Sequence, residues 1–267
     1  MTAIASMGHV ASDVVADGAP RPGGAVFYAA RAFARIGAPA HITASCAAAD
    51  RDTLMRPLEE LGLALRWRES ATTARYSFHY EGDRRIMRQE AVGDSWDAEA
   101  ALEAVGDARW VHVGALTRSD FPPETLAAIA EGGRNVLVDA QGLVRTPDVG
   151  PLRTNGSIGD ALRHVTILKL NDEEAETLVG TSSPDDLHAI DLPEVILTLG
   201  SRGSYVITRR SIDHVPARVV VGPVDPTGAG DTFSAAYLTA RASGLAPVEA
   251  ADRATRDVAA FLSGDLV

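Results

Sequence analysis

The sequence contains few of the residues from which disulfides, zinc sites and membrane segments are built. Cys46 is the only cysteine among the 267 residues, so no disulfide can form within the chain. The seven histidines lack the Cys/His or His-Glu-x-x-His spacing of a zinc site. No apolar run reaches membrane-spanning length, and the first residues do not read as a secretory signal. We therefore expect a cytoplasmic protein without zinc and without a membrane partner.

Lysine is equally scarce, since Lys169 is the only lysine among the 25 Lys and Arg residues. It lies in the apolar run 166–170, which predicts a buried strand, and no G-x-x-x-x-G-K-S/T phosphate loop surrounds it. The motifs that accompany the strand lysine of protein kinases are also missing. Any mechanism that needs a lysine must use Lys169, and any phosphate must be bound in another way.

The composition indicates a globular protein that does not bind nucleic acid. The formal net charge is −11, whereas affinity for a phosphate backbone comes largely from Lys and Arg. Hydrophobic residues make up 46% and charged residues 23%, which is ordinary for a folded protein. The length suits one large α/β domain or two small ones, and we expect residues 1–267 to form a single domain.

Short apolar runs alternate with longer Ala/Leu-rich segments of helical period, which predicts βαβ units and a largely parallel sheet. The expected strands are Ala3–Met7, Ala40–Ala44, Trp110–Val113, Val136–Asp139, Thr166–Leu170, Val195–Leu199 and Tyr205–Thr208. The expected helices are Gly24–Ile36, Arg51–Leu61, Pro122–Ala130, Asp172–Val179, Asp231–Ala242 and Pro247–Leu262.

Residues 63–90 break this alternation. Leu63–Arg68, Thr73–Tyr80 and Arg84–Arg88 predict successive strands, with a turn at Glu81-Gly82-Asp83. We expect them to form an antiparallel patch. The patch either covers a site at the carboxyl ends of the parallel strands or simply extends the edge of the sheet.

The segment DPTGAGDTF, residues 225–233, predicts an anion-binding turn. It follows the strand-like run ARVVV, and Pro226 favours an extended conformation at Asp225. Gly228, Ala229 and Gly230 would then present backbone N–H groups at the start of a helix, where the helix dipole favours negative charge. Such a turn can stabilise a phosphoryl group that gathers charge in a transition state.

Asp231 lies in the first turn of this helix, next to the anion site. As a general base it would take a proton from a substrate hydroxyl that attacks the phosphate. Asp225 would position the loop or an ion. The alternative is that Asp231 is only a helix cap and the glycines only a tight turn. A Rossmann reading fails because the third glycine is missing and the motif lies late in the chain.

The string DPTGAGDTF resembles the C-terminal signature of the ribokinase-like, or PfkB, carbohydrate kinases, in which the last aspartate is the catalytic base. The resemblance covers most of the chain and implies a three-layer α/β/α fold with a mostly parallel central sheet and a β lid. Little chain separates Asp13 from Gly23, so the lid should be reduced, from about residues 14–22 and 70–90. A lid-to-lid dimer is then not required, and a monomer or a homodimer stays open.

Further landmarks follow in the family's order. Asp13 matches the aspartate that holds substrate hydroxyls, and Gly23-Gly24 resembles the glycine pair of the substrate side. Asn171 and Glu174 resemble the Asn-x-x-Glu motif, whose glutamate organises Mg²⁺ through water. The stretch 198–203 resembles the segment that lies along ATP, and the members expected to contact it are Thr198, Gly200 and Gly203.

The resemblance thus implies ATP and Mg²⁺ as cofactors. Asp225 and Thr227 occupy positions resembling a monovalent-cation site, which leaves K⁺ as an open question. The heptapeptide DAQGLVR, residues 139–145, resembles a segment near substrate and phosphates and looks closest to the inositol-kinase-like branch. Gln141 stands where asparagine is more usual. We expect Gln141, Arg145 and Arg88 to reach the substrate, although an exposed arginine is the default for a surface strand.

Each landmark also has a purely structural interpretation. Asp13 would be a solvated loop carboxylate and the glycine pair a flexible turn. Asn171 and Glu174 would form a capping box, and residues 198–203 a hairpin. The functional interpretation depends on their order together with the aspartate turn.

Together these features predict an ATP-dependent kinase that phosphorylates a hydroxyl of a small sugar, polyol or cyclitol. One alternative is a nucleoside kinase of adenosine or pseudouridine type, which needs a base-stacking aromatic at the acceptor site. Its candidates are Phe27, Tyr28, Tyr76, Phe78 and Tyr80. Another alternative is a catalytically idle, nucleotide-binding regulator, which would usually have lost Asp231 or the glycines.

Overall fold

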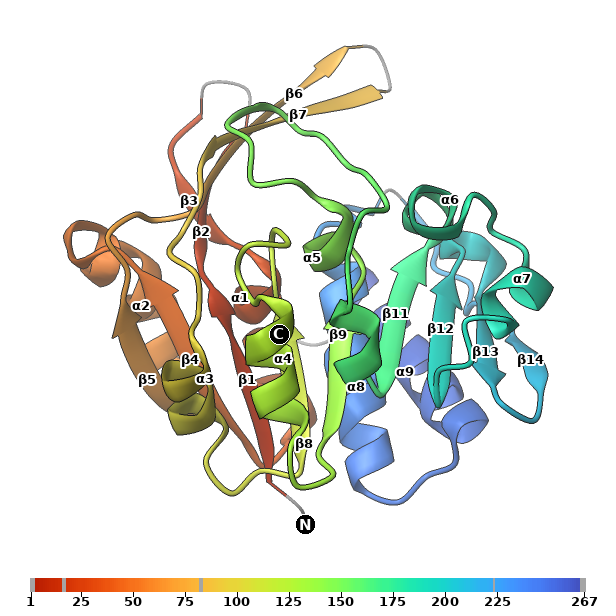
Figure 1. Cartoon of the computed structure of the whole chain (residues 1–267). Coiled ribbons are helices and arrows are strands. Elements are labelled where there is room, and N and C mark those ends of the chain that lie inside the picture. The colour runs from red at the N-terminus through yellow and green to blue at the C-terminus, as the bar shows by residue number, and fades with distance from the viewer. Residues whose placement is uncertain (1–2, 16–17, 82–83, 223, 265–267) are drawn as a thin grey trace.

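A nine-stranded sheet forms the centre of the molecule (Figure 1), in the order β14-β13-β12-β11-β9-β8-β1-β4-β5. The computed structural model describes residues 3–15, 18–81, 84–222 and 224–264. Neighbouring strands from β12 to β5 are parallel, whereas β13 and β14 join as an antiparallel edge. The strands are β1 (Ile4–His9), β4 (Ala40–Cys46), β5 (Ala64–Glu69), β8 (Trp110–Gly114), β9 (Asn135–Asp139), β11 (Ile167–Asn171), β12 (Glu194–Thr198), β13 (Ser204–Thr208) and β14 (Ile212–Val215).

Helices cover both faces of this sheet. One face packs against α1 (Ala25–Ile36), α2 (Arg51–Glu59), α8 (Ala229–Ala242) and α9 (Pro247–Leu262). The other packs against α3 (Ala98–Val105), α4 (Pro123–Ala130), α6 (Asp172–Val179) and α7 (Pro184–His188). Short helical turns are α5 (Gln141–Val144), η1 (Ala48–Asp50), η2 (Ala161–His164) and η3 (Gly200–Arg202). The three-layer α/β/α architecture expected from the sequence is confirmed.

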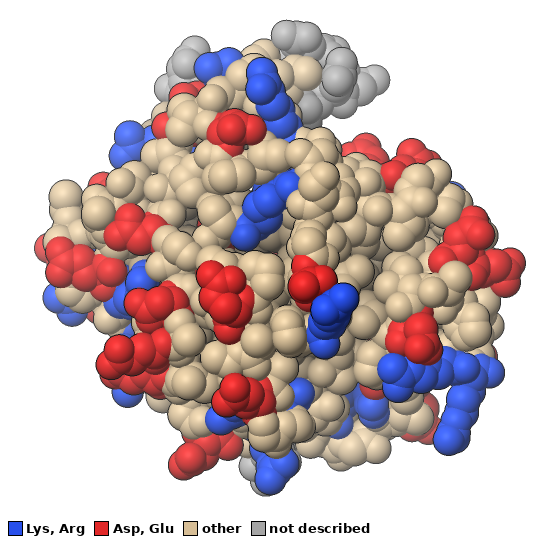
Figure 2. All heavy atoms as spheres, viewed as in Figure 1, with Lys and Arg blue, Asp and Glu red and all other residues tan. Residues whose placement is uncertain are grey.

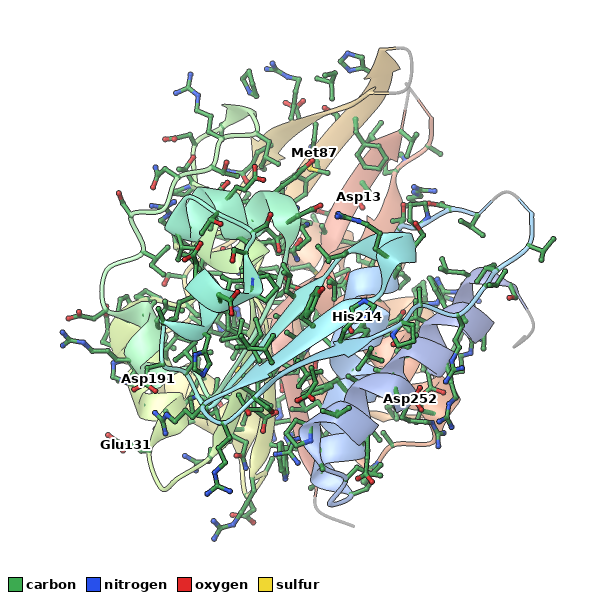
Figure 3. The ribbon with its side chains drawn as sticks, turned by 90° about the vertical axis from the view of Figure 1, so that its right-hand side faces the viewer. Asp13, Met87, Glu131, Asp191, His214 and Asp252 are labelled. Carbon is green, nitrogen blue, oxygen red and sulfur yellow. The ribbon has the colours of Figure 1, made fainter. Side chains whose placement is uncertain are left out.

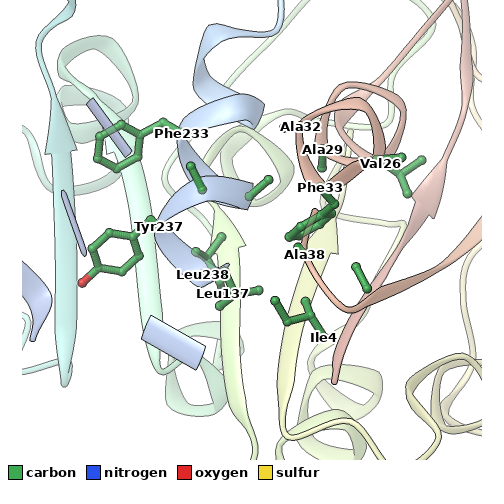
Figure 4. Close-up of a cluster of buried hydrophobic side chains, with 14 of the residues drawn as sticks. Ile4, Val26, Ala29, Ala32, Phe33, Ala38, Leu137, Phe233, Tyr237 and Leu238 are labelled. Carbon is green, nitrogen blue, oxygen red and sulfur yellow. The ribbon is translucent and has the colours of Figure 1, made fainter. Parts of the chain in front are cut away.

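The core between the sheet and the α1–α8 layer fixes where the start of α8 lies. Phe33 of α1 and Leu238 of α8 pack over Ile4 and Leu137 of the sheet, and all four are almost fully buried (Figure 4). Burying a side chain of this size stabilises the fold by about 1.5–3 kcal/mol. The packing holds α8 rigidly, so its first turn is presented at a fixed place above the strand ends.

A second, smaller sheet lies over the carboxyl ends of the parallel strands (Figure 1). Its order is β10-β7-β6-β2-β3, and its strands are β2 (Ala11–Val15), β3 (Arg21–Gly23), β6 (Arg75–Glu81), β7 (Arg84–Ala91) and β10 (Gly150–Pro151). The chain passes from β1 to β2 through Val10 alone, so one continuous segment joins the two sheets. The hairpin β6–β7 is antiparallel, as expected, and residues 82–83 of its expected turn lie outside the described residues.

Two expectations about strands were wrong. Leu63–Arg68 does not belong to an antiparallel patch, because β5 pairs in parallel with β4 at the edge of the central sheet. The α2 crossover between β4 and β5 makes this parallel pairing natural. The run ARVVV, residues 217–221, is not a strand, and Val219 and Val221 are 91% and 92% exposed. Its β-branched composition suggested a strand, but such composition favours a strand only where neighbouring strands pack beside it, and residues 217–221 have none in the described structure.

In the part of the chain that the structure describes, no helix is long and apolar enough to cross a membrane. Figure 2 shows arginines on one face of the molecule, separated by Asp, Glu and uncharged residues instead of forming a continuous basic surface.

Candidate active site

A cavity of about 300 Å³ is lined by residues at the carboxyl ends of β9 and β11 of the central sheet and by residues of β2, β6 and β7 of the small sheet. Open α/β sheets place their ligands at this edge, where successive loops diverge. Figure 3 shows Asp13 and Met87 at this end of the molecule, away from Glu131 and Asp191. The cavity is lined by Asp13, Gly24, Ala25, Tyr28, Tyr76, Met87, Leu116, Asp139, Gln141, Arg145, Lys169, Asn171, Glu174, Pro226, Thr227, Gly228, Gly230 and Asp231.

The glycine turn forms one wall of this cavity. Gly228 is the N-cap of α8 with φ 82°, a left-handed conformation that favours glycine. Within the described residues, the amides of Gly228, Gly230 and Asp231 make no hydrogen bond, as expected for the first turn of a helix. They remain available to an anion.

Ala229 does not belong with these donors, contrary to expectation. Its N–H donates to the Pro226 carbonyl oxygen at 3.0 Å, which closes a tight turn before the helix. The residue faces a neighbouring groove instead of the cavity. The amides that remain available to an anion are therefore those on either side of Ala229 in the turn.

Asp231 is partly buried at the mouth of α8. Burial first, and then the charge of Asp139, raise the pKa of its carboxyl to about 7, against the opposing charges of Lys169 and Arg145. A carboxylate with such a pKa is a stronger base than an exposed aspartate, and at neutral pH a large share of it is ionised. The arrangement can accept a proton from a hydroxyl in the cavity.

Lys169 and Asp139 form a buried ion pair in the floor of the cavity. The Lys169 Nζ atom lies 2.7 Å from Asp139 Oδ2, and the two residues are register partners on β11 and β9. Asp139 opened the DAQGLVR segment, but neither residue was assigned a role from the sequence. The sequence held a signal for Asp139, which ends an apolar run at the carboxyl end of β9, whereas Lys169 lies in the middle of β11.

Asn171 and Glu174 form the capping box of α6 and also line the cavity. The Glu174 N–H donates to Asn171 Oδ1 at 2.8 Å, and the Asn171 N–H donates to Glu174 Oε2 at 2.9 Å. Burial and the nearby Asp139 raise the pKa of Glu174, against Lys169. The structural and functional interpretations of this pair are therefore not exclusive, since the cap orients the carboxylate toward the cavity.

The carboxylates of the cavity suit a Mg²⁺ ion that takes most of its ligands from water and substrate phosphates. No group of three or more His, Cys, Asp or Glu side chains among the described residues is placed to hold a metal ion. Mg²⁺ commonly uses one or two carboxylates and completes its shell with water and substrate phosphates. Glu174 can serve in that manner.

Asp13 marks the opposite side of the cavity. Its side chain is 7% exposed on β2 and lies against Gly23, where an added Cβ would come within 2.0 Å of Asp13 Oδ2. Gly24 follows with φ 91° and caps α1. The two glycines are therefore needed for space at residue 23 and for conformation at residue 24, so neither is simply a flexible turn.

Two aromatic residues from the candidate set reach this side, Tyr28 of α1 and Tyr76 of β6. Gln89 of β7 holds the Tyr76 hydroxyl at 3.2 Å through its Oε1 atom, while its Nε2 atom donates to the carbonyls of Thr146 and Asp148. Since Gln89 must accept, the Tyr76 hydroxyl donates to it and keeps its lone pairs for another donor. The Tyr80 side chain lies outside the described residues.

Gln141 and Arg145 line the cavity as expected, but Arg88 does not. Arg88 is exposed on β7 and lies 3.5 Å from Glu90, because its position in the strand turns the side chain to the outer face of the small sheet. The expectation that Arg88 reaches the substrate was wrong.

A second groove of about 530 Å³ adjoins the glycine turn on the α9 side. Thr198, Gly200 and Gly203 lie along it, together with the apolar residues Val220, Val224, Phe233, Val258 and Leu262. Asp225 lines neither cavity. It is exposed, and its Oδ1 accepts from the Thr227 N–H at 3.0 Å, which positions the loop.

Solved structures show the same fold. A pyrophosphate-dependent kinase in the ribokinase family, complexed with a pyrophosphate analog and myo-inositol, matches with a TM-score of 0.84 and 21% identity over 97% of this chain and 94% of that one. Arabidopsis thaliana ribokinase complexed with ribose and ATP matches with a TM-score of 0.74 and 19% identity over 98% and 91%. These likenesses show a ribokinase-like fold.

The sequence identifies the family. Residues 10–262 match the pfkB family carbohydrate kinases, and the chain belongs to this family. Bacillus subtilis (strain 168) ribokinase is 28% identical over 173 residues, which cover 65% of this chain and 56% of the relative. Zea mays inositol 3-kinase is 31% identical over 175 residues, 63% of this chain and 43% of the relative. The chain thus spans about half the length of these relatives, and the inositol kinases support its place in the inositol-kinase-like branch.

Proposed function

We propose that this chain is an ATP-dependent kinase that transfers the γ-phosphate to a hydroxyl of a small polyol, with a cyclitol such as inositol favoured over an open or furanose sugar. The observation that carries the proposal is the position of Asp231. Its raised pKa and the free amides of its own helix turn meet in one cavity, between a buried carboxylate on one side and an apolar groove on the other. Phosphoryl transfer needs mainly such positioning and charge stabilisation.

In this mechanism Asp13 binds acceptor hydroxyls, and Gly24 lines the same cavity. The reacting hydroxyl points at Asp231, which takes its proton as the oxygen attacks the γ-phosphorus. The amides of Gly228, Gly230 and Asp231 bind the charge that develops on the phosphoryl oxygens. Arg145 and Gln141 lie beside the same space and would hold the phosphoryl or acceptor oxygens.

A magnesium ion, when bound, would neutralise part of the charge of the donor phosphates. Glu174 would hold it through water, with the carboxylate oriented by Asn171. The donor-side assignment extends to Thr227 beside the turn and to Thr198, Gly200 and Gly203 along the groove. A K⁺ site at Asp225 has less support, because Asp225 is exposed and its Oδ1 atom accepts from the loop backbone.

The groove favours a nucleotide over pyrophosphate as the donor. Its lining is largely apolar, and a nucleobase has an apolar face to bury whereas pyrophosphate has none. The choice needs a test, since three solved structures of similar fold are described as pyrophosphate-dependent. Support for a cyclitol comes from the Zea mays and Oryza sativa inositol 3-kinases among the relatives, the latter 32% identical over 183 residues.

A nucleoside kinase is the second candidate, because Tyr28 and Tyr76 both line the cavity and could flank a base. A panel of myo-inositol, ribose, fructose and adenosine, each with ATP or pyrophosphate, separates the possibilities by the phosphorylated product. The proposal predicts turnover on myo-inositol with ATP. Turnover on adenosine alone would favour the nucleoside kinase, and nucleotide binding without any turnover would favour an idle regulator.

A further inference from the structure

Two charged groups in the cavity, Lys169 and Asp139, have no part in the reaction described so far. Lys169 is the only lysine of the chain, and its side chain is almost fully buried, with the residue 5% exposed. A buried lysine is costly unless its charge is used or paired, so its presence at this cavity calls for a physical reason. Asp139 pairs with it at 2.7 Å and thereby fixes the position of the ammonium.

The ammonium lies directly against the glycine turn. A Cβ atom at residue 230 would stand 2.8 Å from the Lys169 Nζ atom, closer than real Cβ contacts. Because Asp139 holds the ammonium in a buried setting, the lysine has little freedom to withdraw. Gly230 therefore keeps open the point where the only ammonium and the anion-binding amides meet.

The ammonium also has N–H donors that remain available for a ligand. It carries three N–H donors, and within the described residues one of them donates to Asp139 Oδ2. Burial alone would lower the pKa of Lys169, but Asp139 and Glu174 outweigh it and raise the pKa above its ordinary value. The group is therefore a permanent cation.

The charges that line the cavity leave few other partners for a phosphoryl group. The lining carries the carboxylates of Asp13, Asp139, Glu174 and Asp231, which repel phosphate oxygens. Its cationic side chains are Arg145 and Lys169. Lys169 is the one whose charged atom lies against residue 230 of the turn.

We propose that Lys169 is a further catalytic residue, whose ammonium binds the phosphoryl group as it passes from donor to acceptor. The inference rests on the proposed function. A bond forms between the acceptor oxygen and the γ-phosphorus, and the bond from phosphorus to the bridging oxygen of the donor breaks, with its electron pair staying on the departing ADP. The hydroxyl proton goes to Asp231. Lys169 keeps its protons throughout, and Asp139 acts as a positioning residue that aims the ammonium.

The first test compares Lys169→Met with a matched control, Arg241→Met. Arg241 also pairs with a buried carboxylate, at 2.5 Å from Glu194, but lines neither the cavity nor the groove. We expect Lys169→Met to lower kcat by about 100- to 1000-fold with little change in either KM, as for removal of a transition-state donor. Arg241→Met should lose stability with kcat within about threefold of the wild type. Equal kcat losses in the two variants would overturn the inference.

A structural role through Asp231 is separated by pH. If Lys169 only tuned that carboxylate, the kcat loss of Lys169→Met would disappear at pH 9, where Asp231 is ionised in either case. We expect the loss to persist at pH 9. Lys169→Arg, which keeps the charge but changes the geometry, should recover part of kcat.

A binding measurement keeps the inference testable without turnover, using Mg–ADP with and without aluminium fluoride as a phosphoryl mimic. Lys169→Met and the charge-balanced double variant Lys169→Met/Asp139→Asn, which leaves no unpaired buried carboxylate, should bind ADP normally and lose at least about tenfold in affinity for the fluoride complex. If the variants bound each of the two ligands with the same affinity as the wild type, the role of Lys169 would be overturned and the proposed function would still stand. A wild type that binds neither ligand would contradict the proposed function itself, and with it the inference.

Discussion

Tyr28 packs against Gly228 so closely that a Cβ atom at residue 228 would lie 2.4 Å from the Tyr28 Cδ1 atom. Gly228 also has φ 82°, so two separate constraints require glycine there. We expect Gly228→Ala to cost about 1–2 kcal/mol of stability from the backbone conformation and to lower kcat strongly, because the turn and its amides must shift.

Gly180→Ala is the matched control for this prediction. Gly180 has φ 81° at the end of α6, and an added Cβ would meet nothing within 4 Å. It should lose similar stability in a denaturant titration while kcat stays near the wild-type value. If Gly228→Ala retained the kcat of the control, the glycine turn would not be part of the catalytic site.

The pH dependence of kcat/KM reports the base. Burial, followed by Asp139, raises the pKa of Asp231 to about 7, and the base must be ionised to act. We therefore expect kcat/KM to be level above pH 7 and to fall about tenfold per pH unit below it. A profile that stays level down to pH 5 would show that another group accepts the proton.

The same carboxyl makes a prediction about stability. Its pKa rises from 3.8 in the unfolded chain to about 7 in the folded protein, so between these values the folded state binds the extra proton and stability falls as pH rises. Asp231→Asn removes this cost and should be more stable than the wild type at pH 8 by on the order of 2 kcal/mol. The difference should shrink toward pH 4.

Thermal unfolding across pH 4–8 measures that difference. Asp225→Asn serves as the control, since Asp225 is exposed and an asparagine oxygen can still accept from the Thr227 N–H. It should leave the pH dependence of the wild type unchanged. A constant offset between Asp231→Asn and the wild type at every pH would mean that the Asp231 carboxyl does not titrate differently on folding.

Tyr76 offers a test of the acceptor side. Because its hydroxyl donates to Gln89, the oxygen is left to accept from a substrate hydroxyl. Tyr76→Phe should raise the acceptor KM by about 3- to 10-fold, the value of one neutral hydrogen bond, with the ATP KM unchanged. Tyr205→Phe on β13, outside the cavity, should change neither constant. If Tyr76→Phe changed the ATP KM alone, Tyr76 would contact the nucleotide instead of the acceptor.

Val258 tests the donor groove. It lies on α9 in the apolar lining, whereas Val248 on the same helix is 38% exposed and outside the groove. Val258→Asp should raise the ATP KM by at least about tenfold through charge repulsion and loss of apolar contact, and Val248→Asp should not. If the ATP KM of Val258→Asp, measured by ADP release, were unchanged, the nucleotide would not bind in this groove.

The elements of strong periodicity could be predicted from the sequence, and with them the architecture. The helices at 172–179 and 247–262 have the expected bounds, and the parallel strands differ by only a few residues at their ends. The small sheet was partly missed, because β2 and β3 are short and Asp13 interrupts their apolar pattern. The exposed run at 217–221 shows the reverse error, since β-branched composition does not reveal whether a partner strand exists.

Within the site, the sequence predicted residues that a motif holds together and missed those that tertiary pairing brings in. Asp231, Asn171 and Glu174 were named because their spacing is local. The pairing of Lys169 with Asp139 depends on two strands 30 positions apart in the sequence, which no short motif records. Ala229 and Arg88 were placed wrongly because local spacing does not say which way an amide or a strand side chain points.

Turnover by Asp231→Asn, measured together with ATP binding on the same preparation, tests the central claim most directly. The substitution keeps the shape of the side chain and removes its capacity to accept the hydroxyl proton. We predict that kcat with the best acceptor falls at least about 100-fold while ATP affinity stays within about threefold of the wild type. Turnover comparable to the wild type, with ATP still bound, would contradict the assignment of Asp231 as the base.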